Sequence, residues 1–144
     1  TVQSQINALT AGGETYIATG LLWGWRALSP YTPFADGAAY GSRTGKYMIV
    51  MTDGANTHSP NYPDHENSDV VNANTLTSQT CDAIKAKGIK IYTVAFAVTD
   101  AAIKNILRNC ATNAAGYYDS ASVADLQTAF VSIGNSITAV RLIR

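Results

Sequence analysis

The chain has 144 residues, of which 47% are hydrophobic and 14% are charged, so it is long enough and apolar enough to fold as one domain around a core. Its ten basic and ten acidic residues cancel, and no basic stretch clusters, which argues against nucleic acids and anionic membranes as partners. No apolar run approaches the ~20 residues that span a bilayer.

The chain opens in the middle of a helical pattern. Val2, Ile6 and Leu9 have the spacing of one helix face, and the segment 10–13, which holds two consecutive glycines, should end that helix. Because the first residue is not Met and the pattern is already under way, we expect the sequence to be a fragment of a longer protein. Its lack of a signal peptide therefore carries little information.

A second helix is expected over about residues 16–28, and Pro30 and Pro33 should end it. The segment that follows, up to Gly45, is rich in turn-forming residues and predicts a loop. The apolar face of this helix consists of Ile17, Leu21, Leu22 and Trp25.

Residues 46–52, with the sequence KYMIVMT, predict a strand whose two faces are both covered, because large apolar and β-branched side chains suit such a strand. The strand runs directly into Asp53 and Gly54. This carboxylate is either a turn former or a ligand. The polar residues 57–72 then predict an excursion over the surface.

The second half of the chain alternates helices with short apolar strands. Strands are predicted over 89–96 and about 116–119, and helices over about 73–87, from a cap at Asp100 to Cys110, and from about 122 to beyond 137. This alternation predicts an α/β fold with a parallel sheet, right-handed crossovers and helices on both faces. In such folds function gathers in the loops at the carboxyl ends of the strands, where Asp53 lies.

Periodicity also predicts which side chains of two helices face the core. In the 73–87 helix, which Gly88 should end, these residues are Leu76, Cys81 and Ile84. In the last helix they are Val123, Leu126, Phe130, Ile133, Ile137 and Val140.

Several enzyme motifs are incomplete. The stretch GSRTGKY resembles a phosphate loop, but Tyr47 stands where Ser or Thr is needed and Tyr40 stands at the first glycine position. The stretch GGETYIATG lacks the spacing of a dinucleotide turn, and the chain has no G-x-S-x-G elbow. His58 and His65, with the acidic residues around them, could hold a metal, but a solvated loop explains them better because their spacing matches no metal motif.

Thr15 and Asp53 are the remaining candidates for a site. Two glycines deliver Thr15 to the start of a helix, and Asp53 ends a strand. A hydroxyl and a carboxylate in neighbouring strand-end loops suit a hard divalent cation such as Mg²⁺, which takes oxygen ligands and keeps several waters. The alternative is structural: Thr15 caps its helix and Asp53 caps its turn. The residues alone leave both open.

The stretches GGETYIATGLLWGW, KYMIVMTDGAN and KGIKIYTVAF resemble the later part of a von Willebrand factor type A domain. Within that family, LLWGWRALSP and the final LQTAFVSIGNSITAVRL are most similar to the C-terminal part of TadG-like proteins of Tad/Flp pilus assembly. The likeness covers nearly all of residues 1–144 except the excursion at 57–72. It implies a three-layer Rossmann-like domain of which this chain holds the C-terminal portion.

The resemblance implies a metal-ion-dependent adhesion site, in which Thr15 matches the second-loop ligand and Asp53 the third-loop carboxylate. The family's first loop, Asp-x-Ser-x-Ser, has no counterpart, since DSAS at 119–122 has the wrong spacing and follows the wrong strand. The site is then partial, and we expect Mg²⁺ or Mn²⁺ to bind weakly or not at all. The first strands of the sheet are also missing, so strand 46–52 becomes an open apolar edge that another chain or segment should cover.

We therefore expect a binding module without catalytic residues, in a bacterial cell-envelope protein at the periplasmic or extracytoplasmic face of the inner membrane. Its partner would be a pilus or envelope protein, and a segment outside this chain would anchor the full-length protein to the membrane. Two alternatives remain: a structural scaffold whose ion site is vestigial, and a metal-dependent hydrolase using Asp53, His58 and His65.

Cys81 and Cys110, the only cysteines, are either two buried thiols or a disulfide. We predict a disulfide, because sequential helices on one face of a parallel sheet are neighbours and the bond needs Cα atoms within about 7 Å. An extracytoplasmic location, as the resemblance implies, would preserve such a bond.

Overall fold

The computed structural model describes residues 1–10, 12–57 and 69–142. In chain order the elements are α1 (Val2–Asn7), α2 (Ile17–Leu28), β1 (Tyr47–Thr52), α3 (Val70–Ala86), β2 (Lys90–Phe96), α4 (Ala101–Cys110), the short 3-10 helix η2 (Ala114–Gly116), β3 (Tyr117–Ser120) and α5 (Val123–Leu142). Within those ranges, no helix combines the length and the apolar character that crossing a membrane requires.

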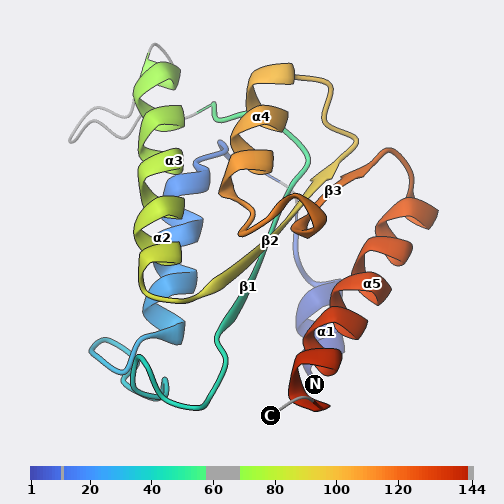
Figure 1. Cartoon of the computed structure of the whole chain (residues 1–144). Coiled ribbons are helices and arrows are strands. Elements are labelled where there is room, and N and C mark those ends of the chain that lie inside the picture. Colours follow the sequence, from blue (N-terminus) through green and yellow to red (C-terminus); the bar gives the residue numbers. More distant parts are fainter. Residues whose placement is uncertain (11, 58–68, 143–144) are drawn as a thin grey trace.

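The sheet has three parallel strands in the order β1-β2-β3, with Tyr47 of β1 opposite Lys90 and Thr93 of β2 opposite Tyr117. Helices α2, α3 and α4 lie on one face of this sheet and α5 lies on the other, as Figure 1 shows. The predicted α/β architecture with a parallel sheet and helices on both faces is confirmed, and the three strands lie within one or two residues of their predicted positions.

The core lies mainly between the sheet and helices α2 to α4. The central strand β2 lies in the middle of the core, because both faces of this strand are covered and both of its edges are paired. The largest fully buried side chains of the core include Ile84, Ile91, Ile103 and Leu107. On the opposite face, α5 buries Ala129 and Ile133.

Local capping explains where several helices begin and end. The Asp100 carboxylate accepts a hydrogen bond from the Ile103 N–H at 2.9 Å and so starts α4, as predicted. Ser122 and Asp125 exchange side chain to backbone hydrogen bonds at the start of α5. At the end of α3, Gly88 adopts a φ of +75°, a left-handed conformation that costs glycine little, and its N–H donates to the Lys85 carbonyl.

Three helices differ from their predicted form. Helix α1 ends at Asn7, before Leu9, and none of its residues is buried. Helix α3 begins at Val70 instead of about residue 73. In its second turn Thr77, and not the predicted Leu76, is fully buried. The Thr77 hydroxyl tolerates burial because it donates a hydrogen bond to the Ala73 carbonyl. In α5 the buried stripe is narrower than predicted, since Val123 and Phe130 are exposed.

Candidate functional site

The loops that carry Thr15 and Asp53 lie side by side at the carboxyl end of β1. The Thr15 N–H donates a hydrogen bond to the Thr57 hydroxyl at 2.8 Å, and the Thr57 N–H donates to the Thr15 carbonyl at 2.8 Å. These two bonds join segments that are 42 positions apart in the chain. The structure therefore brings together the two loops that the sequence singled out.

Asn56 holds this arrangement in place. Its side chain is 2% exposed, and its Oδ1 atom accepts a hydrogen bond from the Ile17 N–H at 2.8 Å. Its Nδ2 group donates to Asn74 Oδ1 at 2.8 Å and to Thr77 Oγ1 at 3.2 Å. Asn56 thus connects the start of α2, the loop after β1 and helix α3.

Local sequence patterns do not single out Asn56, because an asparagine shortly after a strand is indistinguishable from an ordinary turn former. The start of α2 does indicate that a distant residue must cap this helix. The residue at the helix N-cap is Tyr16, whose side chain cannot accept the hydrogen bond that Ser, Thr, Asp or Asn would accept there. A distant acceptor was needed, and Asn56 supplies it.

Within the described ranges, Thr15 does not cap α2 and Asp53 does not cap the turn after β1. The turn after β1 is held by Thr52, whose hydroxyl donates to the Gly54 carbonyl at 3.0 Å and accepts from the Gly54 N–H at 3.3 Å. The first N–H of α2 is satisfied by Asn56 and not by Thr15. Among the residues that the structure describes, the Thr15 hydroxyl and the Asp53 carboxylate make no hydrogen bond, so both remain available to a ligand.

Thr15 is half-buried and Asp53 is exposed. A hydroxyl and a carboxylate are oxygen donors that Mg²⁺ or Mn²⁺ accepts, with water completing the coordination. No three His, Cys, Asp or Glu side chains converge within the described ranges, so a cation here would rest on few protein oxygens. His58 and His65, on which the hydrolase alternative depends, lie outside those ranges.

Charge is distributed unevenly along the strand direction. Six acidic residues lie at or near the carboxyl ends of the strands, namely Glu14, Asp53, Asp69, Asp100, Asp119 and Asp125, with Lys104 paired to Asp119. Basic residues of the described ranges gather toward the opposite end, among them Arg26, Arg43, Lys46, Lys85, Lys87, Lys90 and Arg108, with Asp36 and Asp82 between them. The negative potential of the first group favours cations at the Thr15–Asp53 end.

A groove of about 330 Å³ extends from Thr15 along β1, between that strand and α2. Within the described residues β1 pairs with β2 alone, so its outer edge is unpaired. Ile49 and Met51, which are 42% and 46% exposed, project from the sheet face on which α5 lies, but α5 covers β2 and β3 instead. The predicted open edge is present. Its covering by another chain or segment stays a prediction.

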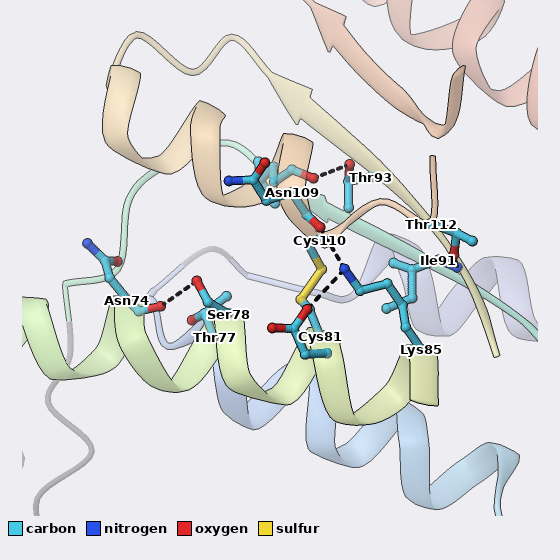
Figure 2. The surroundings of a disulfide bond; sticks show 12 residues. Asn74, Thr77, Ser78, Cys81, Lys85, Ile91, Thr93, Asn109, Cys110 and Thr112 are labelled. Atoms are coloured by element: carbon cyan, nitrogen blue, oxygen red, sulfur yellow. Dashed lines mark hydrogen bonds and ion pairs between the residues drawn. A yellow bond between two sulfur atoms is a disulfide. The ribbon is translucent and has the colours of Figure 1, made fainter. Parts of the chain in front are cut away.

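The predicted disulfide between Cys81 of α3 and Cys110 of α4 is present, with a Cα–Cα distance of 5.2 Å (Figure 2). Both cysteines are fully buried. Lys85 reinforces the same contact, because its ammonium group donates to the Asn109 carbonyl at 2.7 Å (Figure 2). The same ammonium group pairs with Asp82 of α3. Helices α3 and α4 are therefore joined by a covalent and a polar link.

No family model matches this chain, and no curated protein matches its sequence. Solved structures do match its fold. The pilus adhesin SpaC from Lactobacillus rhamnosus GG is similar over 94% of the chain, with a TM-score of 0.70 and 17% identity. Proximal thread matrix protein 1 from the mussel byssus is similar over 91% of it, with a TM-score of 0.58 and 20% identity.

At these identities the comparisons show a shared fold. The chain spans 21% of the length of the adhesin and 29% of the length of the byssus protein, so in both cases the match is to one part of a longer chain.

Proposed function

We propose that the chain is a protein-binding, adhesion-type module of the von Willebrand factor type A class. It belongs to a TadG-like protein of the bacterial cell envelope that takes part in Tad/Flp pilus assembly. The observation that carries the proposal is the hydrogen-bonded pairing of the Thr15 loop with the loop after Asp53. Within the described ranges, it leaves one hydroxyl and one carboxylate without a partner at the same edge of the sheet. The fold shared with a pilus adhesin supports it.

In this proposal Thr15 and Asp53 contribute part of a metal-ion-dependent adhesion site. A cation held by few protein oxygens retains open coordination positions, and a carboxylate of the protein partner would fill one of them. The module carries out no catalysis. It acts at the extracytoplasmic side of the inner membrane, in a full-length protein anchored through a segment outside this chain, where the Cys81–Cys110 disulfide would persist.

A structural scaffold with a vestigial ion site is the second candidate. The exposed position of Asp53 and the scarcity of converging ligands in the described ranges favour it. The two candidates differ in one measurable respect, because only the first requires a cation to bind next to Asp53.

Titration of the isotope-labelled chain with Mn²⁺ tests this difference by NMR, because the paramagnetic ion broadens amide signals close to it. We expect weak binding, at millimolar Mn²⁺, with broadening concentrated at residues 13–15 and 53–56 and competed by Mg²⁺. Asp53→Ala should abolish the effect. Asp36→Ala, which removes an exposed carboxylate at the other end of the molecule, should leave it unchanged.

Broadening that persists unchanged in the Asp53→Ala variant would contradict the adhesion-site assignment and favour the scaffold. Tight stoichiometric binding would show that the chain completes the site with ligands beyond Thr15 and Asp53.

A further inference from the structure

The end of the molecule opposite Thr15 and Asp53 carries a second hollow, about 340 Å³ in volume. One stripe of α2 and the loop after it form its wall, together with the end of α3. The lining residues are Leu22, Trp25, Arg26, Ser29, Tyr31, Tyr40 and Lys87. We call this hollow the aromatic pocket. It shares no residue with the candidate cation site.

The aromatic pocket is held in shape by its own contacts. Trp25 Nε1 donates a hydrogen bond to the Tyr40 hydroxyl at 2.9 Å, which fixes both rings. The Ser29 hydroxyl accepts from the Tyr31 N–H at 3.1 Å, and the Lys46 ammonium donates to the Leu28 carbonyl. A pocket with this bracing is formed before any ligand arrives, which lowers the entropic cost of binding.

Gly37 closes the loop that forms this wall. Its N–H donates to the Ser29 carbonyl at 3.2 Å, and a Cβ atom at this position would lie 2.4 Å from the Leu28 carbonyl oxygen. Only glycine allows the loop to approach the end of α2 this closely.

Large aromatic side chains remain exposed at and beside the pocket. Tyr31 is 67% exposed, and Trp23 and Phe34 are each 48% exposed with their ring centroids 6.1 Å apart. The Arg26 guanidinium lies 4.8 Å from the centroid of the Trp23 ring. Trp, Tyr and Arg are the residues that most often carry the binding energy of protein interfaces, and contiguous exposed apolar surface marks such sites.

The charged side chains that line the pocket are positive. Arg26 and Lys87 line it, and the Lys46 ammonium lies 5.3 Å from the centroid of the Tyr40 ring. Within the described ranges, none of these three cations forms an ion pair with a carboxylate. An acidic ligand is the charge complement of this pocket.

The composition of the wall also narrows the class of ligand. Among the described residues, no carboxylate or carboxamide lines the pocket, so it lacks the bidentate acceptors that most often bind the hydroxyl groups of a neutral sugar. A single-stranded nucleic acid needs a basic groove that follows its backbone over several nucleotides, whereas this site is one hollow on a chain without net charge. A short peptide with one apolar side chain between carboxylates fits both the hollow and its rim.

We propose that the aromatic pocket is a docking site for an acidic protein segment, which inserts an apolar side chain beside Trp25 and Tyr31 and places carboxylates at Arg26, Lys46 and Lys87. This is a second interaction surface of the module. It does not depend on cation binding at Asp53, so the two can fail separately.

Tryptophan fluorescence reports on this end of the molecule, because the chain has two tryptophans, of which Trp25 lines the pocket and Trp23 lies against Arg26 of its wall. The probe is the acetylated and amidated peptide Asp-Asp-Phe-Asp-Asp, which contains no tryptophan. We expect saturable binding with a sub-millimolar Kd that weakens as salt rises. Peptides with Ala for Phe, or Asn for every Asp, should bind at least roughly tenfold more weakly.

Arg26→Glu should weaken the binding of the probe by roughly tenfold or more. Its matched control is Arg108→Glu, which makes the same charge change in the last turn of α4, where Arg108 lies 4.6 Å from the Tyr117 ring centroid. The control should change binding less than about twofold. Tyr31→Ala removes an exposed part of the wall and should weaken binding while the circular dichroism spectrum stays unchanged.

Absence of binding at millimolar peptide would overturn the proposal, as would equal weakening by Arg26→Glu and Arg108→Glu. An oligothymidylate or a polygalacturonate that binds here more tightly than the peptide would overturn the assignment to a protein segment.

Discussion

At the scale of single residues, Asn56 contributes more to the site than the two residues that would contact the ligand. One buried carboxamide supplies the acceptor for the first N–H of α2 and the donors for two side chains of α3. Without Asn56, the first turn of α2, which follows Thr15, would fray. The geometry of the Thr15–Asp53 edge therefore depends on a residue that would not touch the cation.

Asn56→Ala should lower the free energy of unfolding by about 2–3 kcal/mol, because it leaves the buried Ile17 N–H without an acceptor. Urea denaturation measures this loss. Asn74→Ala is the matched control, since it removes only one of the two acceptors of Asn56 Nδ2, and it should cost about 1 kcal/mol or less. Similar losses in both variants would contradict the central role of Asn56.

Whereas the polar atoms of the Asn56 side chain are all hydrogen-bonded, the buried hydroxyl of Tyr117 has no partner among the described residues. The Tyr117 ring stacks under Arg108. Tyr117→Phe removes this unsatisfied group and keeps the ring. We expect it to be neutral or to stabilise the fold by up to about 1 kcal/mol, measured by urea denaturation. A loss of more than that would reveal a hydrogen bond to the hydroxyl in solution.

The same residue should affect stability at high pH. Burial, and next the nearby Asp119 carboxylate, raise the pKa of Tyr117 above its ordinary value of 10.0. The folded state then keeps the phenol proton longer than the unfolded state, so stability is intact below pH 10 and falls as the pH rises above it. Tyr117→Phe should make this fall shallower in denaturation experiments above pH 10. Tyr16 and Tyr92, whose pKa values burial also raises, would retain part of it.

At the scale of elements, the disulfide fastens α3 to α4 on the face of the sheet that holds most of the core. It closes a loop with a sequence separation of 29 residues, for which the chain-entropy estimate is roughly 3–4 kcal/mol. Reduction of the pure protein should therefore lower its midpoint of thermal unfolding.

The double variant Cys81→Ala, Cys110→Ala tests this prediction without a reductant. It should lose about the same stability as the reduced wild type and should not respond to reductant. Two titratable thiols in denatured, unreduced wild-type protein would contradict the bond itself.

At the scale of the whole molecule, the sequence predicted the sheet better than the site. Strands and parallel order followed from dense β-branched runs that alternate with helices, because this pattern has few compact solutions. Thr15 and Asp53 were predicted as site residues from their positions at the start of a helix and the end of a strand, and their role stays a prediction. The structural roles of Asn56 and Thr77 could not be predicted, because they depend on hydrogen bonds between residues that are 39 and 21 positions apart in the chain. Local sequence patterns carry no information about such contacts.

The exposed apolar residues of α1 and α5 show the same limit. Periodicity predicts that a helix has an apolar face, but it does not predict whether the rest of the chain supplies a surface to cover that face. Val2, Ile6 and Phe130 are exposed for this reason.

The open edge of β1 leads to a prediction about association. An unpaired strand with apolar side chains is a template for pairing with another chain, and a charge placed on it blocks such pairing. We expect the wild-type chain to associate as its concentration rises, measured by light scattering after size exclusion, and Ile49→Lys to remain monomeric. Because Ile49 is already 42% exposed, this change should cost the fold less than about 0.5 kcal/mol.

Val131→Lys is the matched control for that experiment, because it makes a similar apolar-to-lysine change at a residue of α5 that is 63% exposed and lies away from the edge. It should leave association unchanged. If both variants suppress association equally, general surface hydrophobicity is responsible. If the wild type stays monomeric at high concentration, the edge of β1 does not bind a second copy, and the segment predicted to cover it must be of a different sequence.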